Sequence, residues 1–115
     1  MIILSTAGDT IQATSSAATC ITITLYGMEK SSTGVNSFKK LGQAQITNSG
    51  TTTLYTLPAS TVTVVSQLVA VNTDIVKRTF DLWHVPNAGS AGNTNILLDD
   101  MELTSKQTYI WGREG

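Results

Sequence analysis

The sequence predicts an all-β, single-domain fold, a β-sandwich or jelly-roll-like barrel of about eight short, mostly antiparallel strands. Apolar and polar residues alternate with a period of two along most of the chain, which is typical of half-buried strands. Of the 115 residues, 19 are Thr and 11 are Ser, and only 13% are charged. Hydroxyl side chains suit the outer face of a sheet. Turn-forming residues recur at the spacing found in sandwiches and barrels. A disordered linker would lack so many Val, Ile and Leu residues.

The first clear strand spans residues 20–26, where Ile and Leu at alternate positions oppose Cys, Thr and Tyr. Gly27 and residues 30–34 read as a turn or loop, because they are small and polar. A weaker strand is expected over residues 41–47.

The next strand spans residues 51–57, and Pro58 ends it because proline cannot donate to the hydrogen-bond ladder. The strongest strand covers residues 62–72, and both of its faces are largely apolar in the second half. Its alternation slips phase near residues 64–65, which predicts a β-bulge in a central strand.

Residues 78–85 alternate clearly and form the next expected strand, closed by Pro86. A short strand is expected over residues 95–98, a turn at residues 99–100, and a last strand over residues 108–111.

Composition argues against several function classes. The net charge of −1 leaves no basic patch for nucleic-acid phosphates. Polar residues interrupt the longest apolar run, residues 62–71, so no membrane span is expected. The apolar start has no basic region before it and is not read as a signal peptide. The single cysteine, Cys20, excludes an intrachain disulfide and a cysteine-based zinc site.

One domain is expected over residues 1–115, with residues 1–6 as an N-terminal arm that pairs with a neighbouring chain. The arm and the aromatic end of the chain are the predicted interface, since Trp and Tyr dominate contact hot spots. The predicted interface residues are Ile2, Ile3, Leu4, Tyr109 and Trp111.

No group of residues predicts catalysis or a cofactor. His84 is the only histidine, and it shares a strand face with Phe80 and Leu82, which favours a packing role over a catalytic triad. Cys20 reads as a small hydrophobe, because no neighbour in sequence lowers its pKa. The chain is therefore expected not to be an enzyme.

Asp99, Asp100 and Glu102 form an acidic cluster at the expected turn. Carboxylates suit Ca²⁺, but the spacing does not match an EF-hand loop, so a solvated turn is favoured over a metal site. Trp83 and Trp111 have three interpretations: an interface anchor, a sugar-stacking platform, or a side chain that closes one end of the sandwich.

Four stretches of the chain stand out: residues 3–12 (ILSTAGDTIQ), 53–73 (TLYTLPASTV through VAVNT), 79–83 (TFDLW) and 108–115 (TYIWGREG). Together they resemble small β-rich virion structural proteins of tailed bacteriophages. The loop of residues 87–93 is longer than the turns of that family. No catalytic residue is carried over by the resemblance.

The resemblance implies a non-enzymatic virion protein, most simply a capsid decoration (cement) protein that stabilises contacts between shell subunits. The alternatives are a tail, collar or fibre-attachment protein and, from another class, a carbohydrate-binding module that uses an exposed Trp. The expected partners are the major capsid protein or other virion proteins and further copies of this chain, with a trimer favoured. Neither nucleic acid nor membrane is an expected partner. The expected location is the virion, assembled in the host cytoplasm.

Overall fold

The structure is a computed structural model that describes residues 1–112; the last three residues of the TYIWGREG stretch lie outside the described part. The described chain forms strands and no helix, so it has no helical segment able to span a membrane. The strands are β1 (Ile2–Leu4), β2 (Thr10–Ser15), β3 (Ile21–Ser31), β4 (Asn36–Gln45), β5 (Thr52–Thr56), β6 (Thr61–Asn72), β7 (Arg78–Val85), β8 (Ile96–Leu103) and β9 (Thr108–Gly112).

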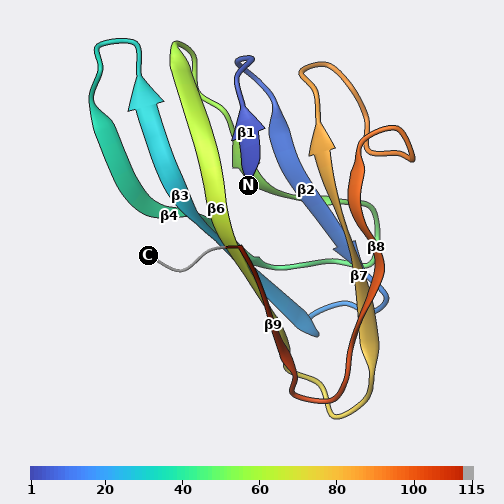
Figure 1. Cartoon of the computed structure of the whole chain (residues 1–115). Coiled ribbons are helices and arrows are strands. Elements are labelled where there is room, and N and C mark those ends of the chain that lie inside the picture. Colours follow the sequence, from blue (N-terminus) through green and yellow to red (C-terminus); the bar gives the residue numbers. More distant parts are fainter. Residues whose placement is uncertain (113–115) are drawn as a thin grey trace.

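The strands form two antiparallel sheets that pack as a β-sandwich (Figure 1). Sheet A has the order β1-β6-β3-β4, and β9 also pairs with β6. Sheet B has the order β5-β2-β7-β8. The two layers lie apart at the end that carries the β3–β4 hairpin and converge at the other end (Figure 1). The predicted all-β sandwich class is confirmed.

Alternation along the strands produces a core between the sheets. In β3, for example, Ile21, Ile23 and Leu25 face inward and are fully buried. Full burial of each such side chain contributes on the order of 2 kcal/mol. The largest fully buried side chains are Phe80, Leu4, Ile11, Ile21, Ile23, Leu25, Ile46, Leu57, Leu68, Leu82, Leu103 and Val65.

Two β-bulges face each other across the middle of β3. Between Leu25 and Tyr26 the pairing with β4 skips Leu41, and between Tyr26 and Gly27 the pairing with β6 skips Ser66. Each extra residue reverses which side chains of its strand face the core. The bulge predicted near residues 64–65 of β6 is therefore confirmed, with Ser66 as the inserted residue.

Several strand boundaries differ from the sequence prediction. Residues 30–31 and Gly27 belong to β3 instead of a loop, and β4 starts at Asn36 instead of residue 41. Asp99 and Asp100 lie within β8 instead of forming a turn. In each case pairing with a neighbouring strand outweighs weak local strand propensity.

The N-terminal residues belong to this chain's own sheet, which corrects the prediction of an arm that pairs with a neighbour. β1 pairs antiparallel with β6, from Ile2 opposite Val65 to Leu4 opposite Thr63. Ile2 and Leu4 are buried in the core. β9 pairs with the next part of the same edge of β6, so β9 and β1 lie end to end there. Only Ile3 of the three predicted N-terminal interface residues is exposed.

A polar network crosses the sandwich beyond the bulges. The Tyr55 hydroxyl of β5 donates to the Glu29 carboxylate of β3 and lies 2.7 Å from the Thr63 hydroxyl of β6. Lys39 of β4 forms an ion pair with Glu29 at 2.6 Å. Thr63 is fully buried, and the β6 bulge is what turns it inward. The network ties sheet B to three strands of sheet A where the layers diverge.

One long side of the sandwich is closed by close backbone contact between β4 and β5. A Cβ atom built on Gly42 would lie 1.9 Å from the Leu54 carbonyl oxygen. No side chain fits at that separation, so glycine allows the two strands to meet.

Gly42→Ala should therefore destabilise the fold by about 2 to 3 kcal/mol, since overpacking forces the backbone to shift. Urea unfolding followed by circular dichroism measures this loss. Gly92→Ala is the matched control, because nothing lies within 4 Å of its Cβ position and its φ is not positive. A Gly42→Ala variant as stable as the control would contradict close β4–β5 contact.

The Tyr55 network predicts a loss of stability at high pH. Burial and, after it, the hydrogen bond to Glu29 raise the pKa of Tyr55 to about 12. The unfolded chain ionises this phenol near pH 10, so its contribution is complete below pH 10 and is lost as the pH rises towards 12. The free energy of unfolding should fall across this window, and Tyr55→Phe should flatten the fall. An equal slope in both proteins would show that Tyr55 is not linked to folding.

Candidate functional site

His84 contacts an acidic residue that already has a structural role. It faces the same side of β7 as Phe80 and Leu82, as predicted, and its Nε2 lies 3.9 Å from Oδ2 of the buried Asp9. The Asp9 carboxylate accepts hydrogen bonds from the backbone amides of Thr6 and Asn87, at 3.3 and 3.0 Å. These contacts anchor the turn before β2 against the end of β7.

Cys20 is held in a protonated state by its surroundings. Its Sγ lies 3.3 Å from Oδ2 of Asp74, which also forms an ion pair with Arg78 at 2.7 Å. Burial first, and then Asp74, raises the pKa of the Cys20 thiol. The fold brings Arg78, which is distant in sequence, near this cysteine, but the carboxylate of Asp74 outweighs its effect. A raised pKa disfavours the reactive thiolate.

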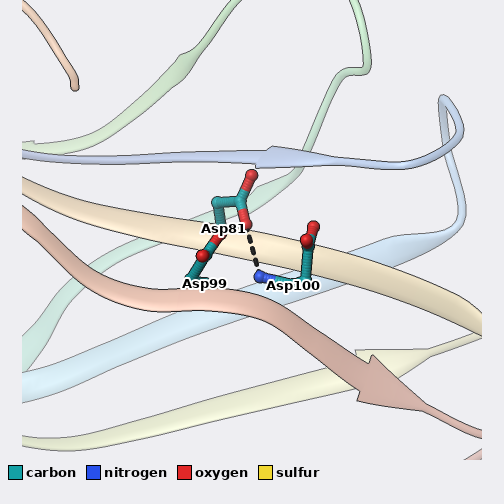
Figure 2. A group of neighbouring side chains, drawn as sticks. All are labelled: Asp81, Asp99 and Asp100. Carbon is teal, nitrogen blue, oxygen red and sulfur yellow. Dashed lines mark hydrogen bonds between the residues drawn. The ribbon is translucent and has the colours of Figure 1, made fainter. Parts of the chain in front are cut away.

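The acidic cluster is built differently from the prediction. Asp99 and Asp100 form a bulge in β8 and meet Asp81 of β7, while Glu102 pairs instead with Lys77 at 3.3 Å. Carboxylate oxygens of the three aspartates lie within 4.8 Å of one another (Figure 2).

The geometry of this cluster is fixed by the backbone. Asp100 has a positive φ of 48°, and its amide donates to Asp81 Oδ1 at 2.6 Å (Figure 2). Burial, followed by the charges of Asp100 and Asp81, raises the pKa of Asp99.

Both tryptophans are unsuited to act as exposed sugar platforms. Trp83 faces the outside of sheet B but is only 9% exposed, and Trp111 is half-buried and packs against the core. Tyr109 packs against Phe80 with ring centroids 6.5 Å apart. Of the three interpretations of the tryptophans, the exposed sugar-stacking platform does not fit their burial, and the predicted interface residues Tyr109 and Trp111 are partly buried against this chain's own core.

A row of apolar side chains, partly or largely exposed, crosses the outer face of sheet A. Strand register places Ile3 opposite Val64, Val64 opposite Met28, and Met28 opposite Phe38. Neighbouring strands lie about 5 Å apart, so these four side chains are successive neighbours. Phe38 is 80% exposed and Ile3 is 54% exposed. We call Ile3, Val64, Met28 and Phe38 the sheet A row.

The sheet A row exists because of the two bulges. Without the extra residues Leu41 and Ser66, the alternation would turn Phe38 and Val64 towards the core. Sequence reasoning identified only Ile3 of this row. The slip in apolar alternation near Val64 is the signal for this row that the sequence offers. It does not identify Phe38, whose outward position depends on the β3–β4 register.

Charge on this face has one sign. Lys30 and Lys40 flank the sheet A row, each on the same face as Met28. In the part of sheet A that the structure describes, the only carboxylate is Glu29, and it faces inward to Tyr55. The sheet A row is therefore an apolar surface flanked by cations.

Comparisons of the chain with protein-family models, with curated proteins and with solved structures found no match.

The raised pKa of Asp99 predicts a stabilising substitution. The folded state holds this proton more tightly than the unfolded chain, so its contribution to stability is complete at acidic pH and is lost as the pH rises through the raised pKa. Asp99→Asn cannot ionise and should raise the urea midpoint at pH 7, with a smaller effect near pH 3. Glu102→Gln, on the same strand but paired with Lys77, should give no such gain. A lower midpoint for Asp99→Asn at pH 7 would contradict mutual repulsion in the cluster.

Proposed function

We propose that this chain is a non-enzymatic structural protein that packs against other protein chains in the virion of a tailed bacteriophage, most simply as a capsid decoration protein. The sheet A row is the observation that carries the packing role. The resemblance of residues 3–12, 53–73, 79–83 and 108–115 to small phage virion proteins supports the setting.

The exposure of Phe38 favours a protein partner. An aromatic side chain exposed to 80% on a sheet gains little from its own fold, and it is the residue type that concentrates binding energy at interfaces. Ile3, Met28 and Val64 extend the same surface across four strands. Contiguous apolar surface of this kind is typical of protein contact sites.

The lysines beside the sheet A row indicate the charge expected on the partner's surface. Lys30 and Lys40 beside the sheet A row favour a shell surface with an apolar centre and a carboxylate rim. The acidic residues Asp81, Asp99 and Asp100 lie on the other sheet. Sheet A thus carries cations and sheet B carries this acidic cluster. Two sides of different charge suit a protein that binds a shell with one side only. Further copies of the chain, with a trimer favoured, would then be arranged by the symmetry of that shell.

The test is binding of Phe38→Ser to shells assembled without this chain. Removal of an aromatic anchor should weaken binding about 30-fold, the equivalent of about 2 kcal/mol. Ile75→Ser is the matched control, because Ile75 is 76% exposed but lies outside sheet A, and it should bind normally. Co-sedimentation measures both, and circular dichroism checks the fold. Equal binding of Phe38→Ser and the parent chain would refute the role of the sheet A row.

A tail, collar or fibre-attachment protein is the alternative within the same class. Mass-spectrometric copy number separates the two, since a shell-covering protein is present in many more copies per particle than a tail component.

A further inference from the structure

The side of the sandwich opposite the β4–β5 contact is open. Within residues 1–112, β8 pairs only with β7, and β1 and β9 pair only with β6. Two strand edges therefore border this side, one from each sheet, and each presents backbone N–H and C=O groups without a strand partner. Unprotected edges of this kind are templates for pairing with another chain.

An apolar cavity of about 210 Å³ lies between these edges. Leu68, Leu82 and Leu98 line it from three strands, Trp111 lines it from β9, and the more exposed Met1 and Leu97 also border it. A buried apolar cavity of roughly 150 Å³ is enough to hold a benzene molecule, so this one has room for a large apolar side chain.

The β8 edge adds a charged feature next to the cavity. Leu97 and Leu98, which line the cavity, are followed at once by Asp99 and Asp100 at the bulge. A strand paired with β8 would meet apolar surface first and then two carboxylates. Its matching sequence is an apolar residue followed, a short distance along, by a lysine or arginine.

We propose that this open side accepts an extended segment of a neighbouring protein chain, which pairs with β8, inserts an apolar side chain beside Trp111 and places a basic residue against Asp99 and Asp100. The combination of an unpaired strand edge with an apolar cavity favours a strand, because main-chain pairing gives affinity and the cavity selects alternate side chains. The inference builds on the proposed function, since it gives the chemistry of a second contact with a neighbouring chain.

The test uses a peptide of about eight residues, a common strand length, with alternating Thr and Leu and a Lys near one end. Its titration into the full chain should produce saturable NMR shifts in the millimolar range or below at the Trp111 indole and the Leu97 and Leu98 amides. The same peptide with N-methyl groups at alternate amides should bind at least tenfold more weakly, because it cannot pair with β8. A peptide with Glu in place of Lys should also lose affinity.

Leu97→Lys is the decisive variant. Leu97 is 43% exposed at an edge, so lysine is tolerated there, yet its charge borders the cavity and should abolish the shifts. Ile75→Lys, at another exposed position, should bind as the parent chain does. Absence of saturable shifts, equal binding of the N-methylated peptide, or unchanged binding by Leu97→Lys would each overturn the inference. Phe38→Ser should keep peptide binding while it loses shell binding, so failure here is distinguishable from failure of the proposed function.

Discussion

The pair of bulges opposite Tyr26 and Gly27 is the constraint on which the rest of sheet A depends. Leu41 and Ser66 are each skipped by the pairing with β3, so β4 and β6 reverse their inward and outward faces at the same level of the sheet. Close backbone approach makes this possible, since a Cβ on Gly27 would lie 2.0 Å from the Val64 carbonyl oxygen. On the side of the bulges where Leu25 lies opposite Leu68, β3 and β6 contribute large aliphatic side chains to the core.

Beyond the bulges, the same reversal has two opposite consequences. Thr63 turns inward, where it joins Tyr55 and Glu29 in a satisfied polar network between the sheets. Val64 and Phe38 turn outward, where they extend the sheet A row. The polar interior and the apolar exterior at this end of the molecule therefore have a single cause. An apolar core would have needed Val64 inward and would have removed the surface on which the proposed function rests.

Local pattern was enough to predict the class of fold, since alternation over residues 78–85 and 62–72 matches β7 and β6 closely. Local pattern failed for segments that form a strand only because they pair with another strand. Asn36 to Lys40 have weak strand propensity, and only pairing with β3 makes them β4. The apolar start predicts an arm, because the sequence does not reveal that β1 pairs with the edge of β6 in the same chain. The candidate site was missed for the same reason: the sheet A row joins residues far apart in sequence through register alone.

The most direct test of the packing role is hydroxyl-radical footprinting of the free chain and of the assembled particle, read by mass spectrometry. Aromatic and sulfur-containing side chains in contact with a neighbour lose solvent, so oxidation of Phe38 and Met28 should fall sharply on assembly. Ile75, which is exposed outside sheet A, should be oxidised equally in both states. Equal oxidation of Phe38 and Met28 in the free and assembled states would contradict the account.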